Sequence, residues 1–380
     1  MAVFKGLYSF AVITSFVLLC SKTQATVLPE ERADFMFHSY DGGGITIDGP
    51  SVIVRKNFAE KVSVSANYYV DTISSASIDV VASGASRYSE ERTETSFSAT
   101  YLHNKSLLTI SHADSDENDY EAKTTTFSIS QDFFGDLTTL SMGYSQGEDI
   151  IRQTGNTDFE EDSERQNYRV GITQILTPKL IASLNYEGIT DEGWLNNPYR
   201  FYRFRDNTGG FQRAQEVYPN TRTSDAAALT FLYYLPYRAS VKFEYRAFTD
   251  DWEIESDTAQ ITYLHPYKNW LFEFKLRGYE QTGAFFYSDL FESESQDARD
   301  FRARDKELSD FSNSTIGIGI SYRLPAWKVV EESSITVEWE RIDFEYDNFT
   351  DITQTGFVTG EEPLYRLEAD VIRVYFSLFY

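Results

Sequence analysis

The segment at positions 370–380, with the sequence DVIRVYFSLFY, decides the fold class of this chain. Apolar side chains occupy every second position of it, at Ile372, Val374, Phe376 and Leu378. Successive side chains of a β-strand point to opposite faces, so the pattern predicts a strand with one apolar and one polar face. Phe376, Leu378 and the final Tyr380 are typical of the terminal signal by which the assembly machinery recognises outer-membrane barrels. The terminal strand of a soluble β protein would show the same alternation.

The same period of two runs along the rest of the chain. Segments with one apolar and one polar face include 62–71, 140–144, 168–173, 241–247, 272–277, 316–322 and 335–340. Such strands fit two classes of protein: a membrane barrel whose apolar face meets lipid, and a soluble sandwich whose apolar face is buried. The mean hydropathy of -0.40 excludes a bundle of apolar helices but suits half-apolar strands joined by polar loops.

The predicted connections between these strands alternate between short and long. Short ones lie at 57–60, 103–104, 132–136, 177–179, 236–238 and 265–269, with a slightly longer one at 324–332. Long polar ones lie at 73–92, 147–165, 190–224, 280–311 and 343–368, with shorter members at 114–121 and 249–255. Bacterial outer-membrane barrels have short periplasmic turns and long extracellular loops, whereas a sandwich has no reason to sort its connections. The sorting favours the membrane barrel.

Strand counting predicts about sixteen strands. Fourteen segments fill most of the chain, and two more precede them at 32–40 and 45–55, joined by the glycines of 41–44. Pro50 interrupts the second of these strands, because proline lacks the amide hydrogen that a strand ladder needs. We therefore expect one all-β domain over 26–380, a transmembrane up-and-down antiparallel β-barrel of about sixteen strands.

Residues 1–25 have the features of a secretory signal peptide. Lys5 supplies the positive charge, 7–19 is the apolar run, and a cut is expected after Ala25. The alternatives are a retained anchor, for which the apolar run is short, and a lipoprotein signal at Cys20. Cleavage would remove Cys20, the only cysteine, which excludes disulfides and cysteine chemistry. The expected location is the outer membrane of a Gram-negative bacterium.

Charge narrows the expected partners. The formal net charge of -25 argues against nucleic acid, because phosphate binding needs a basic face. The expected partners are outer-membrane lipid, the barrel assembly machinery, an unknown small solute and a possible periplasmic or surface protein. No cofactor is predicted. Carboxylates crowd 147–165 and 280–311, but they lack EF-hand spacing, so a solvated acidic surface is preferred over a metal site.

Several stretches carry a resemblance to a known family. They are 38–44 (HSYDGGG), 62–81, 129–136 (ISQDFFGD), 192–200 (EGWLNNPYR), 218–223 (YPNTRT), 286–291 (FYSDLF), 303–308 (ARDKEL) and 361–365 (EEPLY). In these stretches the chain resembles a bacterial family known as domain of unknown function 3570. The resemblance covers nearly all of the expected mature chain. It implies an outer-membrane barrel and carries no established activity or catalytic residues.

The predicted inner faces of the strands carry both signs of charge. The candidates are Lys242, Glu244, Arg246, Glu273, Lys275, Arg277, Glu338, Glu340 and Arg373. A barrel of this size is wide enough for an aqueous channel, in which such charges would set selectivity. The alternative is a lumen closed by cross-strand ion pairs with a purely structural role. Both interpretations stay open at this point.

The long connection 190–224 is unusually rich in aromatic residues and arginines. A fully solvated loop should not hold so many aromatics, so we expect it to fold inward as a constriction or to pack as a lid. Candidate constriction or solute-binding residues are Trp194, Arg200, Arg203, Arg205 and Arg222. These arginines would select an anionic solute through charge-assisted hydrogen bonds. The alternative is that they pair with neighbouring acidic loops.

Catalysis has weak support in the sequence. His112 with Asp114 and Asp116, and His38 with Asp41, lie near the predicted outer rim, where a histidine and carboxylates can orient water or bind a metal. No recognisable nucleophile motif accompanies them, so we expect no enzyme and no catalytic residue. The sequence therefore favours a channel or transport component, ahead of a plugged structural or partner-binding barrel and, third, a rim hydrolase.

Overall fold

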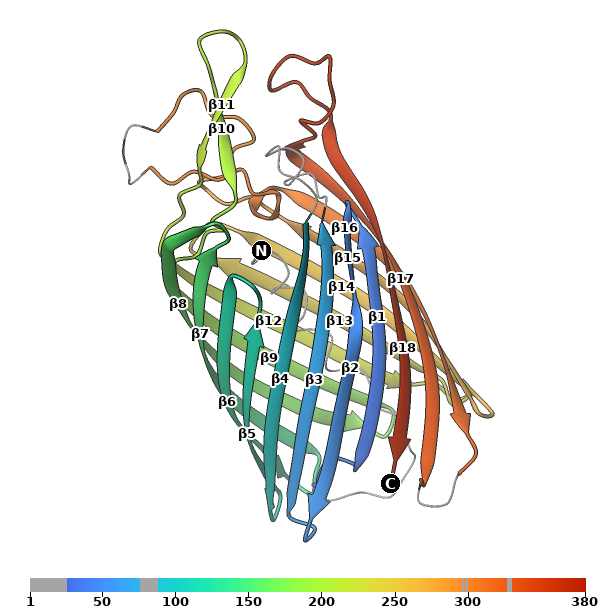
Figure 1. Cartoon of the computed structure of the whole chain (residues 1–380). Coiled ribbons are helices and arrows are strands. Elements are labelled where there is room, and N and C mark those ends of the chain that lie inside the picture. Colours follow the sequence, from blue (N-terminus) through green and yellow to red (C-terminus); the bar gives the residue numbers. More distant parts are fainter. Residues whose placement is uncertain (1–25, 76–87, 296, 298–299, 327–329) are drawn as a thin grey trace.

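The computed structural model describes residues 26–75, 88–295, 297, 300–326 and 330–380, and these form a closed antiparallel barrel (Figure 1). The barrel strands are β1 (Arg32–Gly42), β2 (Ile45–Phe58), β3 (Val62–Ser75), β4 (Tyr88–His103), β5 (Ser106–Asp116), β6 (Tyr120–Phe133), β7 (Thr138–Gln153), β8 (Asn156–Thr177), β9 (Leu180–Gly193), β12 (Thr221–Tyr234), β13 (Ser240–Asp250), β14 (Glu255–Tyr267), β15 (Trp270–Gln281), β16 (Phe311–Leu324), β17 (Glu332–Thr350) and β18 (Leu364–Phe379). These are sixteen strands in up-and-down order. The predicted fold class and strand number are confirmed. The predicted signal peptide lies outside the described residues.

The barrel closes where the first and last strands meet. Phe35 of β1 is the register partner of Phe376 of β18, and their rings stack with centroids 6.4 Å apart. Tyr380 follows β18, and its hydroxyl donates a hydrogen bond to the carbonyl oxygen of Arg55 in β2. Closure satisfies the backbone of both terminal strands, which removes the exposed sheet edges that a lipid bilayer does not tolerate.

The two faces of the wall differ as the alternation predicts. Side chains such as Phe97, Phe127 and Leu276 are more than half exposed on the outer face, where lipid would replace water. Alternate positions turn polar or charged side chains toward the interior. No helix in the described parts of the chain is long and apolar enough to cross a membrane.

Pro50 occupies a local break in the wall. It pairs with Phe37 of β1, but the ladder from β2 to β3 omits Gly49 and Pro50. A Cβ atom added at Gly49 would lie 1.8 Å from the carbonyl oxygen of Val70. Only glycine therefore permits the approach of β3 at this level. The second strand is therefore continuous through Pro50, and the predicted interruption is confined to its ladder with β3.

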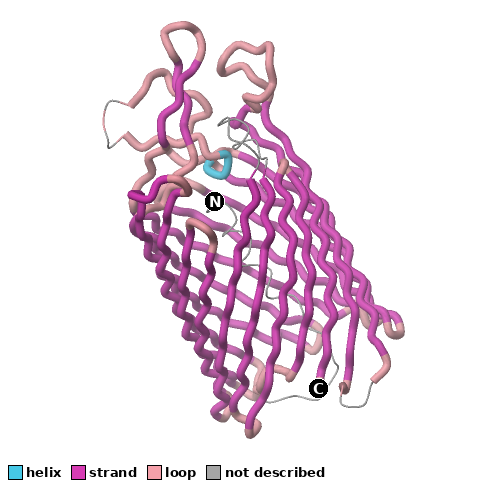
Figure 2. Tube along the Cα trace, in the orientation of Figure 1, coloured by secondary structure: helices cyan, strands magenta, loops and turns pink. Residues whose placement is uncertain are grey.

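The two ends of the barrel differ in their connections (Figure 2). Tight turns gather at the end that holds the C-terminus, and the long connections lie at the other end. One long loop was wrongly predicted: 147–165 belongs mostly to β7 and β8, which extend as a hairpin and meet at a turn around Gly155. Its carboxylates misled the prediction, because charged residues are compatible with strands that project into water.

Candidate functional site

Three connections fold together at the outer end of the barrel. They are 194–220 between β9 and β12, 282–310 between β15 and β16, and 351–363 between β17 and β18; we call their described residues the cap. The first contains a hairpin, β10 (Phe201–Arg205) and β11 (Phe211–Gln215), and the second contains a short 3₁₀ helix, η2 (Lys306–Leu308). Figure 1 shows the three segments gathered above the end of the barrel opposite the C-terminus.

The cap contacts opposite sides of the barrel mouth. Tyr199 donates its hydroxyl hydrogen to Asp119, in the turn between β5 and β6. The next residue, Arg200, forms an ion pair with Asp305 of the connection between β15 and β16. In the closed strand order β6 and β16 lie on nearly opposite sides of the barrel. The connection 194–220 therefore joins both sides of the mouth.

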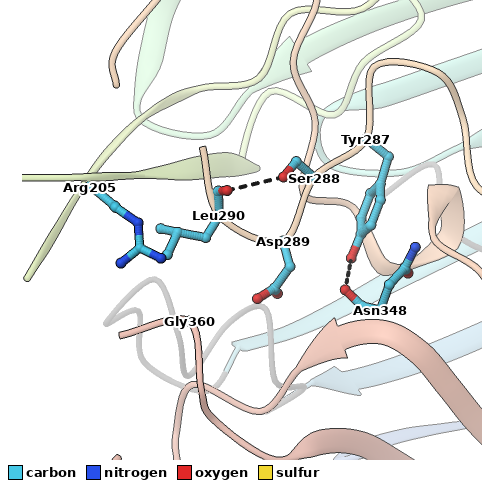
Figure 3. A pocket seen from close by; sticks show the side chains of 7 residues that line it. All are labelled: Arg205, Tyr287, Ser288, Asp289, Leu290, Asn348 and Gly360. Atoms are coloured by element: carbon cyan, nitrogen blue, oxygen red, sulfur yellow. Dashed lines mark hydrogen bonds between the residues drawn. The ribbon is translucent and has the colours of Figure 1, made fainter. Parts of the chain in front are cut away.

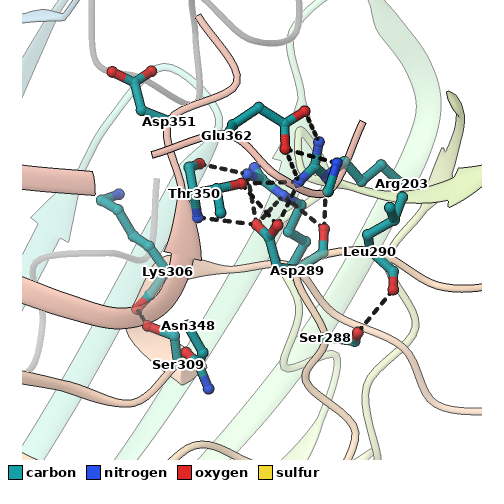
Figure 4. Close-up of polar contacts among 12 residues, drawn as sticks. Arg203, Ser288, Asp289, Leu290, Lys306, Ser309, Asn348, Thr350, Asp351 and Glu362 are labelled. Carbon is teal, nitrogen blue, oxygen red and sulfur yellow. Dashed lines mark hydrogen bonds and ion pairs between the residues drawn. The ribbon is translucent and has the colours of Figure 1, made fainter. Parts of the chain in front are cut away.

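A buried arginine ties the three connections to one another (Figure 4). The Arg203 side chain, about 2% exposed, forms ion pairs with Asp289 and, at 2.8 Å, with Glu362. It also donates a hydrogen bond to the Thr350 hydroxyl, 2.8 Å away at the end of β17. Burial alone would raise the pKa of Glu362, but hydrogen bonds from Arg203 hold that pKa below its usual value. The network therefore keeps the carboxylate of Glu362 charged.

Asp289 is the acceptor around which these groups converge. It takes a hydrogen bond from Nε of Arg304 at 3.0 Å, and from the Thr350 hydroxyl at 2.8 Å. The guanidinium of Arg304 also lies 4.3 Å from the ring centroid of Phe349. A buried charge network of this kind is sensitive to the loss of any single partner, because the remaining charge is left unpaired.

An apolar cluster supports the same region of the cap. Its buried members are Tyr218, Trp252, Ile254, Ala284, Phe286, Ala303 and Leu308. Two carboxylates, Glu216 and Asp305, lie at its edge, and the Tyr218 hydroxyl donates to Glu216 at 2.7 Å and approaches Asp305 at 3.3 Å. Burial and the neighbouring Asp305 raise the pKa of Glu216 to about 7. The cap core therefore contains a group that titrates near neutral pH.

A cavity of about 380 Å³ opens beside the Arg203 network. Arg205, Asp289 and Asn348 are among its lining residues (Figure 3). Arg205 is 45% exposed and holds Glu292 only weakly, at 3.4 Å. Its guanidinium is therefore the accessible positive group of the cavity, whereas Arg203 is enclosed.

The sequence-predicted constriction residues are distributed through the cap and its base. Arg200 and Arg203 are buried in ion pairs, which corresponds to the alternative of pairing with acidic loops. Arg222, on β12, pairs with Asp250 and stacks on the ring of Trp252 at 4.7 Å. Trp194 packs edge-on against Phe159, and its Nε1 is buried with no hydrogen-bond partner among the residues that the structure describes. A role of these residues in binding solute stays a prediction.

The sequence-predicted lumen charges form pairs on the inner wall. Lys242, Glu244 and Arg246 alternate with the exposed Phe243 and Tyr245, so they project inward. Lys242 pairs with Glu244 at 2.8 Å, while Arg246 approaches Glu187 at 3.7 Å. On the neighbouring strands Lys275 pairs with Glu340 at 2.7 Å, and Arg373 bridges Glu340 and Glu338 at 3.0 and 3.5 Å. Arg277 donates to Asn313 instead.

The pair of Glu338 and Arg373 belongs to a longer row of ionisable groups across the strands. Cross-strand partners in sequence along this row are Glu273, Gly319, Glu338, Arg373, His38 and Gly49, followed by the pair Asp71 and Arg92. Gly319 leaves room for the side chains of Glu273 and Glu338, whereas Gly49 lets the backbone of β3 approach. The row gives the inner wall a belt of ionisable groups of both signs, and we call it the charged belt.

The two candidate histidines occupy different environments. His38 reaches across Gly49 to Asp71, with Nε2 2.7 Å from the carboxylate, and is buried in the wall. The carboxylate that His38 contacts is therefore Asp71, and not the Asp41 that the sequence places beside it at the rim. His112 lies 3.3 Å from Asp114, as expected, but shares the outward face of β5 with the exposed Leu108 and Ile110. A hydrolytic role would place its chemistry outside the lumen.

Sequence reasoning did not select Asp289, Arg304 and Glu362 as a cluster. Each lies in one of the family-like stretches, at 286–291, 303–308 and 361–365. The stretch 192–200 supplies Tyr199 and Arg200 to the same cap. The available signal was therefore the convergence of separate family-like stretches, because long polar loops have no periodicity that predicts their contacts.

Solved structures with a similar fold are outer-membrane proteins of low sequence identity. A bacterial polysaccharide outer membrane secretin is 8% identical with a TM-score of 0.49, over 92% of this chain and 98% of that one. The outer membrane protein opdK from Pseudomonas aeruginosa is 9% identical with a TM-score of 0.44, over 92% and 99%. A Pseudomonas aeruginosa FadL homologue is 10% identical with a TM-score of 0.42, over 93% and 91%. Similarity at this level extends only to the barrel architecture.

The family comparison is more specific. No curated protein is significantly similar to the chain in sequence. The family model described as Protein of unknown function (DUF3570) matches residues 80–168 and 156–341, which together make up more than half of the chain. The match includes the family-like stretches 192–200, 286–291 and 303–308 of the cap, while 361–365 lies beyond it. The chain therefore belongs to the DUF3570 family.

Proposed function

We propose that this protein is an outer-membrane channel for small polar or charged solutes, with the cap controlling its outer entrance. The observation that carries the proposal is the charged belt on the inner wall. Fixed charges of both signs along a water-filled path produce a selective field for ions and polar solutes. A barrel of sixteen strands is wide enough to hold such a path.

The cap gives the channel a means of control. Its three segments are held to one another by the ion pairs of Arg200 and Arg203, so their separation would open the mouth without disturbing the wall. The exposed guanidinium of Arg205 provides a first contact for an anionic group that enters the cavity beside it. The solute class that best fits this entrance is a small anion such as a carboxylate.

Conductance in a planar bilayer tests the proposal. We expect measurable current from the folded wild-type protein and a larger current from Arg203→Met, because that substitution weakens the cap. Lys275→Gln should shift selectivity toward cations, since it removes one positive charge from the inner wall beside the belt while Glu340 keeps Arg373 as a partner. Arg366→Gln, on the exposed outer surface, is the matched control and should leave selectivity unchanged.

A structural or partner-binding barrel is the second candidate. Phe357 and Val358 in the connection 351–363 are 54% and 63% exposed beyond the barrel mouth, which favours a surface protein as partner. Absence of current from both the wild type and Arg203→Met, with heat-modifiable gel migration intact in each, would reject the channel in favour of this candidate.

A further inference from the structure

Three side chains on the outer face of the wall are connected in the order hydroxyl, imidazole, carboxylate. Nδ1 of His112 on β5 lies 2.9 Å from Oγ1 of Thr125 on β6, which is hydrogen-bond distance. Nε2 of the same ring lies 3.3 Å from a carboxylate oxygen of Asp114. The hydroxyl and the carboxylate therefore contact different nitrogens of one imidazole. In this arrangement a base can take a proton from a hydroxyl nucleophile while a third group orients the base.

The register of the sheet brings these residues together. His112 and Thr125 are direct partners in the ladder of β5 and β6, and Asp114 follows His112 by two positions on the same face. Thr125 shares the outer face of β6 with Phe127, an exposed apolar residue. Direct partners in an antiparallel ladder have Cβ atoms about 4.5–5.5 Å apart, which lets a short hydroxyl side chain meet an imidazole.

The two neighbours of His112 favour one of its tautomers. A carboxylate only accepts hydrogen bonds, so Asp114 favours the neutral ring that carries its hydrogen on Nε2. Nδ1 is then an acceptor, and the Thr125 hydroxyl donates to it. The contact with Asp114 can tighten when the ring becomes positive during a reaction, because the two groups then carry opposite charges. The hydroxyl is therefore placed to give its proton to His112.

A fourth residue supplies hydrogen-bond donors beside the hydroxyl. Gln146 on β7 is the direct cross-strand partner of Thr125 and shares its outer face with the exposed Met142. At the spacing of such partners, a side-chain amide reaches the space around the Thr125 hydroxyl. An amide in this place can donate to the oxygen that becomes negative when an ester carbonyl is attacked.

The position of these residues along the strands indicates the class of substrate. Leu108 and Ile110 precede His112 on the outer face of β5 and are exposed where lipid would cover them. Asp114 and Asp116 follow it on the same face. The apolar band of a membrane barrel ends where polar side chains replace apolar ones on the outer face. The four residues therefore lie at the outer edge of this band, at the level of the headgroups, where the acyl ester bonds of a lipid are found.

We propose that Thr125, His112 and Asp114 form a catalytic site that hydrolyses acyl esters of membrane lipids. Thr125 Oγ1 attacks the carbonyl carbon of the ester and gives its proton to Nδ1 of His112. The bond from this carbon to the alcohol oxygen breaks, and the leaving oxygen takes the proton from His112. Water then attacks the acyl group on Thr125 and gives a proton to His112, which returns it to Thr125. The products are a fatty acid and the deacylated lipid.

This activity is independent of conduction, because the site lies on the outside of the wall. It departs from the sequence-based expectation of no enzyme, for which His112 and its carboxylates lacked a nucleophile. His112 and Thr125 are thirteen positions apart and lie on different strands, so no local motif joins them. Only the register of β5 and β6 identifies Thr125 as the missing hydroxyl.

The test uses the full chain refolded from inclusion bodies, so that no native lipase accompanies it. The probe is phosphatidylcholine with a fluorescent acyl chain in mixed micelles, and the released fatty acid is measured. The wild type should hydrolyse it. Thr125→Val should abolish hydrolysis, Thr125→Ser should retain it, and His112→Gln should lower kcat by about 10²–10⁴-fold. Thr190→Val, on the same cross-strand row of the outer face, is the matched control and should leave kcat unchanged.

The two supporting residues should give different signatures. Asp114 acts through His112 and is a positioning residue, so Asp114→Asn should lower kcat while KM changes little. Asp114→Glu should restore part of the lost activity, because it keeps the carboxylate. Gln146→Leu removes the proposed donor to the ester oxygen and should lower kcat by about 10²–10³-fold.

Covalent labelling supplies a readout besides turnover. A long-chain alkyl fluorophosphonate should react with Thr125 Oγ1 and release fluoride, and mass spectrometry should find the adduct in the wild type and not in His112→Gln. Absence of hydrolysis by wild-type protein that is heat-modifiable on a gel would overturn the proposal. Hydrolysis that survives Thr125→Val would also overturn it, because the contact of His112 with Thr125 would then be structural only.

Discussion

The barrel wall and the cap are stabilised in different ways. In the wall nearly every strand pairs with its neighbour in sequence, and the bonding is spread evenly over long ladders. In the cap the main contacts join distant residues, such as Arg203 with Glu362 across 159 positions, and a few buried charges hold several segments. The wall should therefore tolerate most single changes, whereas the cap should fail when one central residue is lost.

The largest effect should come from the centre of the cap. Arg203→Met would leave Asp289 and Glu362 without their common guanidinium in a buried site, which typically costs about 3–5 kcal/mol. Arg205→Met, two residues away on the same strand, removes an exposed and weakly paired side chain, which is worth about 0–1 kcal/mol. Hydrogen exchange of the connection 194–220 should report the difference.

The wall provides the internal reference for this comparison. Exchange in β3 to β7 should be the same in Arg203→Met, Arg205→Met and the wild type. Equal exchange of the cap in the two variants would contradict a central role for Arg203, and loss of protection throughout the barrel would contradict the separation of cap from wall.

The difference also explains how much could be predicted from sequence. Strand identity follows from a period of two, so the wall, its strand number and the break at Pro50 were predicted from local pattern. The contacts of Arg203 could not be, because an arginine in a polar loop pairs with whichever carboxylate the fold brings near. Aromatic content did predict that 190–224 packs, since an apolar surface of that size needs cover.

The prediction of a loop at 147–165 was wrong because the outer ends of β7 and β8 lack the alternating pattern. The stretch 147–165 contains many carboxylates, and the pattern of a half-apolar strand disappears once a strand leaves the lipid. Periodicity reports the solvent on each face of a strand and not the strand itself. The outer ends of strands, where the cap is anchored, are therefore the part of a barrel wall that sequence predicts least well.

A smaller effect is expected at Gly49, where two strands of the wall approach each other closely. Gly49→Ala would place a methyl group 1.8 Å from the Val70 carbonyl oxygen, so β2 and β3 must separate. Overpacking of this kind costs about 1–3 kcal/mol. The separation would also disturb the contact between His38 and Asp71, which passes over Gly49. The temperature at which gel migration changes should fall.

Gly278→Ala is the matched substitution in the wall. No atom lies within 4 Å of the Cβ that it would add, so its transition should stay at the wild-type temperature. A similar fall in the transition temperature of both variants would mean that glycine flexibility, and not the close approach of strands, determines the stability. An unchanged transition temperature in Gly49→Ala would show that the strands at Gly49 can separate without loss of stability.

The smallest expected effect is the change in opening of the cap with pH. Burial and Asp305 raise the pKa of Glu216 to about 7, against the opposing influence of Arg200 and hydrogen bonds from Arg304 and Tyr218. In an opened cap the same carboxyl would titrate near its ordinary value of 4.5. The closed cap thus holds a proton that the open cap releases between pH 4.5 and 7. Closure is most favourable below this window and weakens as pH rises through it.

Opening of the cap should therefore increase between pH 5 and 7 by at most about tenfold per pH unit, since one proton is involved. It should then level off, as followed by hydrogen exchange corrected for intrinsic rates. Glu216→Gln keeps an acceptor for Tyr218 but cannot ionise, so its opening should lose this dependence. Glu292→Gln, at a highly exposed carboxylate of the same cap, should retain it. An unchanged pH profile in Glu216→Gln would assign the titration to another group, and a pH-independent wild type would mean that Glu216 keeps one protonation state whether the cap is closed or open.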